Sequence, residues 1–278
     1  MMEERKFSAY MCVWAGDKAP FVRLAMESLL NQTLLPNELM VVSDGPIPDE
    51  LKAVIEDPIF APLSVKPIYL EEHVGVGNAR GVALNACENE LVAIMDSDDY
   101  SMPDRFEKQI KFMSEHPEID ILGGTNGYFT EDPSEVITCC ISPETQEEIL
   151  KEIKTHCPFS NVTVMYRKSR VLEAGGYIDW FWEEDYYLWA RMLKIGCRGH
   201  NLPDILVNVR TSPDQMGRRG GWRYFKSERK MHRYLYTAGF IGFFGYLRNI
   251  SLRFVAEVLL TKRMRYIARR LFVWKKKK

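Results

Sequence analysis

Short apolar runs alternate with polar, helix-compatible segments through the first half of the chain. Each apolar run ends at turn-forming residues, which predicts four strands, at residues 7–13, 38–42, 63–70 and 91–95. Between them, residues 19–31 and 78–87 are predicted to be helical. This alternation is typical of an α/β fold, in which a mainly parallel sheet is flanked by helices and ligands bind beyond the carboxyl ends of the strands.

The alternation weakens in the second half of the chain. We expect a helix from just after Pro103 to about Glu115, and a second helix at residues 183–195. Further strands are predicted at residues 119–128, 136–141 and 161–166. Because no internal repeat or low-complexity linker separates the halves, we expect one domain over residues 1–235 and a helical tail over residues 236–278.

The charge distribution divides the chain into an acidic body and a basic tail. With 278 residues, 46% of them hydrophobic, the chain can bury a full core, which excludes a disordered or fibrous protein. The formal net charge of −1 hides an asymmetry, because residues 248–278 contain eleven Lys or Arg side chains and the single acid Glu257. The tail therefore carries +10 and the body −11, which indicates an anionic partner for the tail.

The tail has the pattern of helices that lie on a membrane surface. Residues 252–260 and 266–274 mix apolar and aromatic side chains with Arg and Lys, as interfacial helices do. The apolar run before them ends at Arg248, short of the roughly 18 residues that a span needs. Since the first residues are polar and show no signal-peptide pattern, we predict a cytoplasmic protein held peripherally on an anionic membrane surface. Nucleic acid is disfavoured, because the body is acidic and apolar side chains do not contact phosphates.

Three carboxylates gather after the fourth strand. Asp96, Asp98 and Asp99 fall within four residues and would repel one another unless a cation joined them. Mg²⁺ or Mn²⁺ prefers such oxygen ligands and is commonly held by one or two carboxylates together with substrate phosphates. The alternative is an acidic turn ahead of the next helix, since Asp and Ser are favoured in turns and helix caps.

Several short motifs follow one another in a recognisable order. They are VVSDG at residues 41–45, GVGNARG at 75–81, IMDSDD at 94–99, PFSNVTVMYR at 158–167, AGGY at 174–177 and EEDYYLW at 183–189. Their order and spacing resemble those of the family 2 glycosyltransferases, which have the GT-A (Rossmann-like) fold. The likeness covers about residues 7–225 and is greatest to bacterial enzymes that build O-antigen, capsule or exopolysaccharide.

The resemblance implies roles for the polar residues near the strand ends. Asp44 would contact the base or ribose of a nucleotide sugar, with Arg80 nearby, and Asp96 would contact the ribose or the donor sugar. Asp98, with Asp96, would hold Mn²⁺ or Mg²⁺ against the donor diphosphate, where the metal neutralises the leaving group. From the residues alone, the alternatives are that Asp44 is a turn residue before Gly-Pro and that Arg80 is an exposed helix charge.

The motif at residues 183–189 resembles the acidic pair that deprotonates the acceptor in this family. Asp185 would be the general base that takes the proton of the acceptor hydroxyl, with Glu184 as its acidic neighbour. One displacement assisted by one base inverts the anomeric centre, so an α-linked donor would give a β-linked product. The alternative is that both acids have no catalytic role and only stabilise the helix, by interacting with the positive N-terminal end of its dipole.

Two further groups are candidates for substrate contacts. Trp180 and Trp182 directly precede the expected base and could stack on an acceptor sugar, although large aromatic residues more often belong to the core. Arg218 and Arg219, next to two glycines, would suit a loop that closes over a diphosphate, with an exposed basic turn as the alternative.

Together these features predict an inverting glycosyltransferase that uses a UDP-sugar and a lipid-linked saccharide acceptor. Two alternatives stay open. A sugar nucleotidyltransferase would usually have a Gly-rich loop with Arg and Lys after the first strand, and residues 14–18 (WAGDK) match this poorly. A non-catalytic, membrane-bound saccharide-binding protein would not need a base paired with a metal site, so Asp96, Asp98 and Asp185 argue against it.

Overall fold

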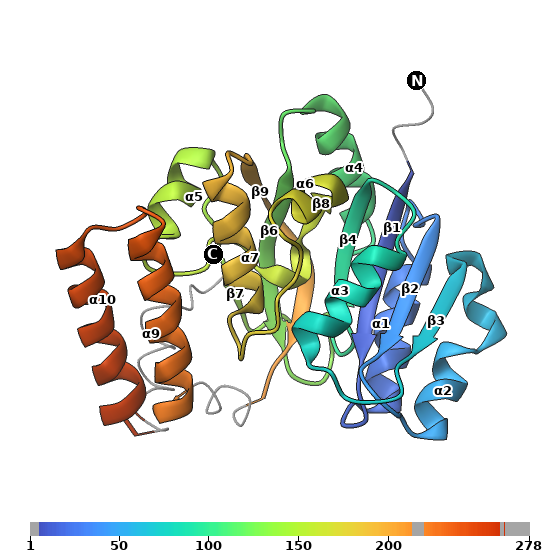
Figure 1. The fold of residues 1–278 in the computed structure, drawn as a ribbon. Coiled ribbons are helices and arrows are strands. Elements are labelled where there is room, and N and C mark those ends of the chain that lie inside the picture. The colour runs from blue at the N-terminus through green and yellow to red at the C-terminus, as the bar shows by residue number, and fades with distance from the viewer. Residues whose placement is uncertain (1–5, 213–219, 262–263, 265–278) are drawn as a thin grey trace.

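The chain folds around one mixed sheet. The computed structural model describes residues 6–212, 220–261 and 264, and within them nine strands form this sheet. Helices cover both of its faces (Figure 1). The α/β class expected from the alternating pattern is therefore confirmed.

The N-terminal half of the sheet is parallel. Its spatial order is β3 (Val65–Tyr69), β2 (Glu38–Ser43), β1 (Phe7–Val13) and β4 (Leu91–Asp96). Helical segments return the chain between successive strands, namely α1 (Ala19–Leu30), α2 (Asp49–Ile55) with the 3₁₀ helix η2 (Pro58–Leu63), and α3 (Val76–Ala86). The four strands and two helices predicted for this half are confirmed, each end within two residues.

The C-terminal half of the sheet is mixed in direction. β8 (Met165–Arg167) is antiparallel to both β4 and β6 (Ile121–Phe129), while β9 (Gly199–Arg210) is parallel to β6. Two short strands, β5 (Tyr100–Ser101) and β7 (Thr138–Cys140), pair antiparallel with β9 and β6. The full order is therefore β3-β2-β1-β4-β8-β6-β9-β5, with β7 on β6.

Two features of this half differ from the sequence predictions. The strand expected at residues 161–166 begins instead as a 3₁₀ helix, η3 (Asn161–Thr163), and only its end belongs to β8. β9 was not predicted at all, because Pro203 and Asp204 interrupt its apolar pattern. β9 is extended because it pairs with β6 along the length of that strand, although its own sequence pattern does not predict a strand.

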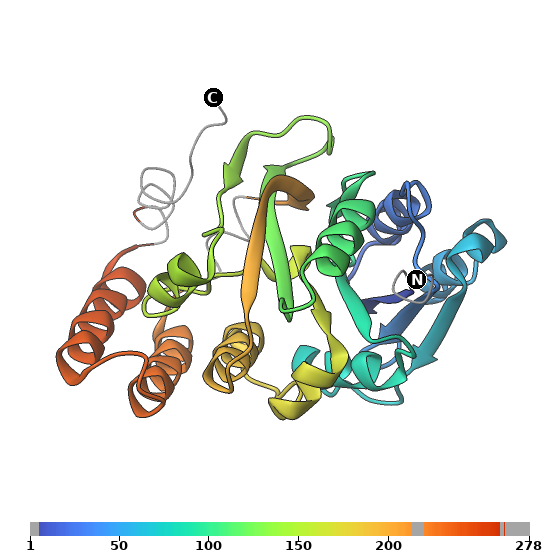
Figure 2. The ribbon, with the colours of Figure 1, turned by 90° about the horizontal axis from the view of Figure 1, so that it is seen from above.

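Each face of the sheet has its own core. Side chains alternate along the strands, so Phe7 and Met11 of β1 point to one face and Tyr10 points to the other. The first face is covered by α1, α2 and α4 (Arg105–Glu115). The second is covered by α3, α5 (Gln146–Glu152), α6 (Lys168–Glu173) and α7 (Glu184–Lys194), and Figure 2 shows the two helical layers on either side of the sheet. Burial on both faces explains why the parallel strands are continuous apolar runs.

Two long helices extend the second layer. α9 (Trp222–Thr237) buries Met231 and Leu235 in the core beside α7, and it runs across the domain boundary expected at residue 235. α10 (Phe243–Phe254), continued by a π-helical turn η4 (Val255–Leu259), packs on the outer side of α9 (Figure 1). No helix in the described residues is long and apolar enough to cross a membrane.

The outer helix is attached to the body by polar contacts and carries an apolar surface. Asn249 donates to the Lys154 carbonyl at 2.7 Å, and Arg253 donates to the Thr155 carbonyl at 2.9 Å. The remaining face exposes large apolar side chains, which are Phe243, Phe244, Leu247, Leu252, Val255 and Leu259. We define these six residues as the α10 apolar surface.

Candidate active site

The candidate site lies where three parallel strands end side by side. Asp96 is the last residue of β4, and Asp44 directly follows β2. β1 lies between these strands, with Cys12 opposite both Asp96 and Val42. The polar groups therefore gather at the carboxyl edge of the sheet, as the sequence predicts.

Asp44 holds the loop that precedes α3. Its Oδ1 accepts hydrogen bonds from the Val74 and Gly75 amides at 2.7 and 3.2 Å, and its Oδ2 lies 2.9 Å from His73 Nδ1. Gly75 has a φ of +92°, and a Cβ added there would lie 2.7 Å from an Asp179 carboxylate oxygen. Glycine is therefore required at this turn by both backbone conformation and space.

The acidic turn after β4 contacts the loop after β1. Ser97 donates to Asp17 Oδ2 at 2.8 Å, and the same oxygen accepts from the Trp14 amide at 3.1 Å. Burial and the nearby charges of Asp96 and Asp17 raise the pKa of Asp98 to about 6. Burial, followed by the charges of its acidic neighbours, also raises the pKa of Asp99 well above its usual range. The turn thus concentrates buried negative charge, which Arg210 offsets only in part.

This concentration of carboxylates fits a divalent cation shared with a substrate. Within residues 6–212, 220–261 and 264, no three His, Cys, Asp or Glu side chains are placed to hold a metal ion by themselves. Mg²⁺ and similar ions are usually bound by one or two carboxylates plus substrate phosphates, and the carboxylates of Asp96 and Asp98 lie close enough for the charge of one to act on the other.

Arg210 positions the acidic turn, and no local sequence pattern indicates this role. Its backbone amide donates to Asp99 Oδ1 at 2.9 Å, and its Nε donates to the Asp98 carbonyl at 3.2 Å. The guanidinium also lies 3.9 Å from the Phe21 ring centroid. Because Arg210 is the last residue of the unpredicted strand β9, only the sheet topology brings it to this turn.

Arg80 joins the end of β4 to the start of α7. Its Nη1 donates to Glu184 Oε1 at 2.7 Å, and its Nη2 donates to Asp96 Oδ1 at 3.1 Å. The residue is only 7% exposed, so the alternative of an exposed helix charge is wrong. Burial by itself lowers the pKa of Arg80, but the charges of Asp96 and Glu184 raise it further than burial lowers it, so the side chain stays cationic.

The two acids at the start of α7 have different environments. Glu184 is 7% exposed, and burial raises its pKa to about 7, with Arg80 acting in the lowering direction and the Asp185 charge in the raising direction. Asp185 is half-buried, and its Oδ1 accepts from the Tyr186 amide at 2.6 Å. Glu184 is thus held against Arg80 in a buried position, whereas Asp185 is the more accessible acid.

The remaining candidates are placed unevenly. Trp180 is 8% exposed and donates its Nε1 to Ser227 Oγ at 2.8 Å, so most of its ring belongs to the core. Trp182 is exposed and has a φ of +64°, an uncommon backbone conformation for a bulky residue. Arg218 and Arg219 lie outside the described residues.

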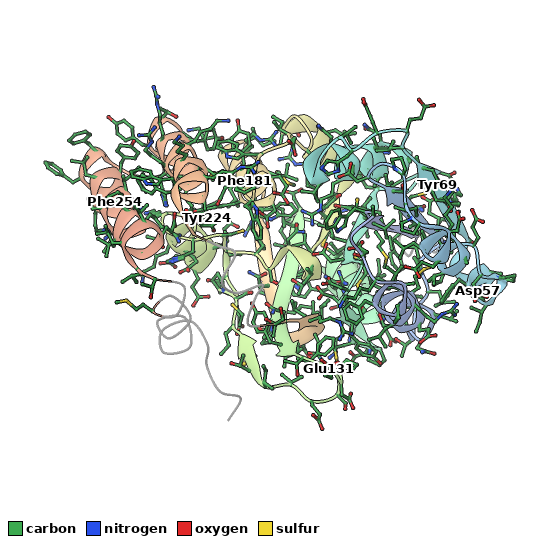
Figure 3. The ribbon with its side chains drawn as sticks, turned by 90° about the horizontal axis from the view of Figure 1, so that it is seen from below. Asp57, Tyr69, Glu131, Phe181, Tyr224 and Phe254 are labelled. Atoms are coloured by element: carbon green, nitrogen blue, oxygen red, sulfur yellow. The ribbon has the colours of Figure 1, made fainter. Side chains whose placement is uncertain are left out.

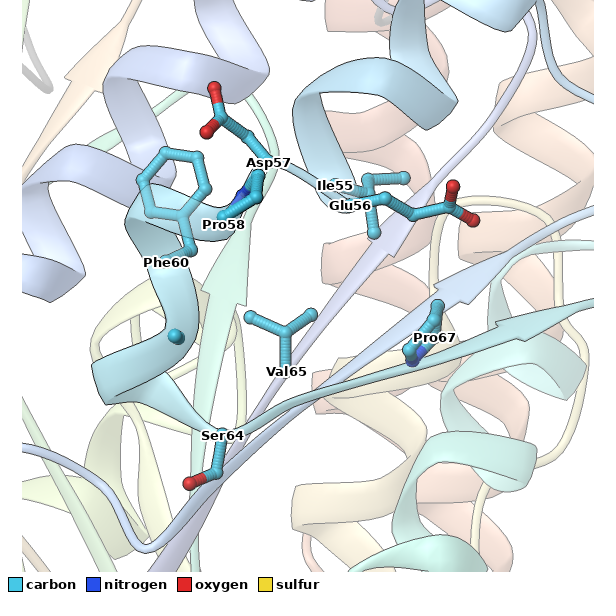
Figure 4. A pocket seen from close by; sticks show the side chains of 9 residues that line it. Ile55, Glu56, Asp57, Pro58, Phe60, Ser64, Val65 and Pro67 are labelled. Carbon is cyan, nitrogen blue, oxygen red and sulfur yellow. The ribbon is translucent and has the colours of Figure 1, made fainter.

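One hollow of about 340 Å³ lies away from these groups. It is bounded by α2, η2 and the start of β3, with Phe60, Val65 and Pro67 among its lining residues (Figure 4). β3 is parallel to the strands that end at Asp44 and Asp96, so its start is at the opposite edge of the sheet. The hollow is therefore separate from the candidate active site.

The chain belongs to glycosyl transferase family 2, whose model matches residues 8–177. This stretch contains Asp44, Arg80, Asp96 and Asp98. The protein is therefore a glycosyltransferase, as the resemblance of its motifs implied.

Named relatives agree with this assignment over nearly the whole chain. A protein of Haemophilus influenzae called an uncharacterized glycosyltransferase is 36% identical over 92% of this chain and 95% of its own length. An Escherichia coli enzyme named UDP-Gal:alpha-D-GlcNAc-diphosphoundecaprenol beta-1,3-galactosyltransferase is 33% identical over 94% of both chains.

Solved structures show the same fold at low sequence identity. S. aureus TarS (residues 1–349) in complex with UDP-GlcNAc is 20% identical, with a TM-score of 0.65 over 96% of this chain and 76% of that chain. A mannosyltransferase from Pyrobaculum calidifontis with GDP-Man and Mn²⁺ is 13% identical, with a TM-score of 0.63 over 96% and 75% of the two chains. The GT-A-type fold expected from the motifs is confirmed.

Proposed function

We propose that this glycosyltransferase transfers the sugar of a UDP-sugar to a hydroxyl of a lipid-linked saccharide, with inversion at the anomeric carbon. The reaction would serve the synthesis of a surface polysaccharide. The observation that carries the proposal is the pair of contacts made by Arg80. They tie Asp96, on the expected donor side, to Glu184, the neighbour of the expected base. Donor and acceptor chemistry would therefore meet around one buried guanidinium.

On the donor side, we assign Asp44, Arg80 and Asp96 to the nucleotide sugar. Asp44 fixes the loop at Val74 and Gly75, which shapes the nucleotide side of the site. Arg80 holds Asp96 in place through its second amino group. The donor complexes of the structural relatives, with UDP-GlcNAc and with GDP-Man, are consistent with a nucleotide diphosphate sugar here.

We assign the divalent ion, Mn²⁺ or Mg²⁺, to Asp98 with Asp96. Bound there, the ion would supply Lewis-acid stabilisation of the diphosphate leaving group. The raised pKa of Asp98 is consistent with this assignment, because it reflects burial together with the nearby charges of Asp96 and Asp17, and a bound cation would offset both. The Mn²⁺ in the Pyrobaculum mannosyltransferase is consistent with the same type of cofactor.

On the acceptor side, we assign Asp185 as the general base. It directly follows Glu184, which is buried against Arg80, and it is the more exposed of the two acids, which favours it as the group that takes a proton from a hydroxyl. A single displacement with one base gives inversion. The name of the E. coli relative, which states an alpha-linked diphosphoundecaprenol acceptor and a beta linkage, supports a lipid-linked acceptor.

We infer that the protein binds an anionic membrane surface through α10 and the basic tail. The α10 apolar surface supports this, since Phe244 is 84% exposed and lies beside other exposed apolar side chains. Of the predicted tail, residues 262–263 and 265–278 lie outside the described part of the chain. Family membership favours glycosyl transfer over the nucleotidyltransferase and saccharide-binding alternatives.

A donor and acceptor screen tests the proposal. The full-length protein is incubated with a panel of nucleotide sugars and a sugar-diphospho-alkyl acceptor, in Mn²⁺ and in EDTA. We expect transfer from one UDP-sugar in Mn²⁺ only, and a β-linked product by NMR. An α-linked product would contradict inversion, and transfer only from GDP- or ADP-sugars would contradict the donor assignment.

A further inference from the structure

A basic groove lies between α9 and the loop that leads into α7. It has a volume of about 330 Å³, and Asp179, Trp180, Phe181, Arg223, Lys226, Ser227 and Lys230 line it. We propose that this groove binds the phosphate groups that join the acceptor saccharide to its lipid. The inference rests on the proposed function and deepens it, because it names how the acceptor is recognised beyond its sugar.

The two walls of the groove are fixed to each other before any ligand binds. Trp180 Nε1 donates to Ser227 Oγ at 2.8 Å, and Ser227 Oγ donates to the Phe181 carbonyl at 2.6 Å. Ser227 is buried on α9, so this pair of bonds holds the loop against the helix. A ligand would therefore meet a preformed site, which lowers the entropy cost of binding.

Cations dominate the lining. Arg223, Lys226 and Lys230 face a single carboxylate, Asp179. Two of these cations rest on aromatic rings, with Lys230 Nζ at 3.8 Å from the Trp180 centroid and the Arg223 guanidinium at 4.0 Å from the Phe181 centroid. A cation placed over a ring keeps its charge available to an anion, unlike a cation paired with a carboxylate. The groove thus presents excess positive charge on a rigid frame.

The rest of α9 increases the positive potential around the groove. Arg229 and Arg233 are also exposed on this helix, outside the groove lining. The single acid of α9, Glu228, is buried and lies 3.4 Å from Arg253 of α10. Its charge is therefore compensated within the protein and does not offset the exposed cations.

The position of the groove matches the order of groups in a lipid-linked saccharide. On one side, the loop of Trp180 and Phe181 leads within four residues to Asp185, and Asp179 approaches the loop at Gly75. On the other side, α9 packs against α10, and α10 carries the exposed α10 apolar surface. Figure 3 shows this sequence of elements, from Phe181 through Tyr224 of α9 to Phe254 of α10. Sugar, phosphates and lipid would lie in that order.

A single experiment with matched variants tests the groove. Lys226→Ala/Lys230→Ala removes two cations from the lining, and Arg229→Ala/Arg233→Ala removes two from the same helix outside it. Binding of inorganic pyrophosphate is measured by calorimetry on the full-length proteins in EDTA, where metal-dependent binding at the donor site is suppressed. We expect the groove variant to weaken binding by roughly tenfold and the control variant to change it much less. Equal weakening by both variants, or none, would overturn the proposal.

A kinetic comparison links the groove to the acceptor. We compare kcat/KM for a sugar-diphospho-alkyl acceptor with kcat/KM for the corresponding alkyl glycoside. The ratio should fall by roughly tenfold in the groove variant and stay at the wild-type value in the control. An unchanged ratio would contradict the assignment, and an unchanged ratio with reduced binding to anionic vesicles would identify a lipid headgroup as the ligand instead. If the wild type glycosylates neither acceptor, the proposed function fails, while pyrophosphate binding still decides whether the groove is a phosphate site.

Discussion

Replacing Glu184 by glutamine tests whether the active site holds an acid whose burial destabilises the fold. The side chain is 7% exposed and makes a 2.7 Å hydrogen bond with Arg80. Burial raises its pKa to about 7, although Arg80 acts in the opposite direction. Glutamine keeps the shape of the side chain and can still accept from Arg80, but it has no charge to bury.

The direction of the pKa shift sets the sign of the effect. The folded-state pKa lies above the ordinary value of 4.5, so the native protein retains a proton that the unfolded chain releases. Wild-type stability should therefore fall as pH rises from about 4.5 to about 7, and the penalty stays constant above that. At 1.36 kcal/mol per pKa unit, the loss between about pH 5 and pH 8 is about 2–3 kcal/mol.

Urea unfolding at these two pH values measures the effect. The Glu184→Gln variant should match the wild type closely at about pH 5 and be more stable by about 2–3 kcal/mol at about pH 8. Glu135→Gln, at an exposed position, controls for the change in net charge. A stability difference that does not change with pH, or a variant less stable at about pH 8, would refute the reasoning. Arg80 would then stabilise the carboxylate more than burial penalises it.

Three further predictions concern catalysis, the metal and the membrane. Asp185→Asn should leave donor binding nearly intact and lower turnover by about two to four orders of magnitude, and near-normal turnover alongside an inactive Glu184→Gln would make Glu184 the base. Calorimetry should show UDP binding that depends on Mn²⁺ in the wild type and loses this dependence in Asp98→Ala. Equal affinity in EDTA would remove the metal role. Phe244→Glu should reduce co-sedimentation with anionic vesicles, whereas Ile59→Glu, exposed to 54% on η2, should not; equal sedimentation of both would contradict the α10 assignment.

The parallel half of the fold could be predicted because its strands are buried on both faces. β1 and β4 are continuous apolar runs whose local sequence is enough to identify them. β9 differs, since Pro203 and Asp204 break its pattern and its place is determined by pairing with β6. α9 was missed for a related reason: its buried side chains, Met231 among them, are interleaved with many cations.

The sequence predicts that polar residues gather at the strand ends, but it does not predict the contacts that they make. An acidic residue at a strand end can be recognised because it directly follows an apolar run, as Asp96 does. The pairing of Arg80 with Glu184 joins residues 104 positions apart, and no local pattern contains that information. The same holds for Arg210, whose role depends on a strand that only the sheet topology reveals.

The attachment of α10 to the body has a consequence for which acceptors can react. Asn249 and Arg253 hydrogen-bond the helix to carbonyl groups of residues 154 and 155, so α10 is not carried on a flexible tether. With its apolar surface in the lipid interface, this rigid connection would set one height of Asp185 above the bilayer. An acceptor whose saccharide is too short or too long would not bring its terminal hydroxyl to that height. The protein would then select acceptors by the length of the saccharide as well as by the identity of its sugar.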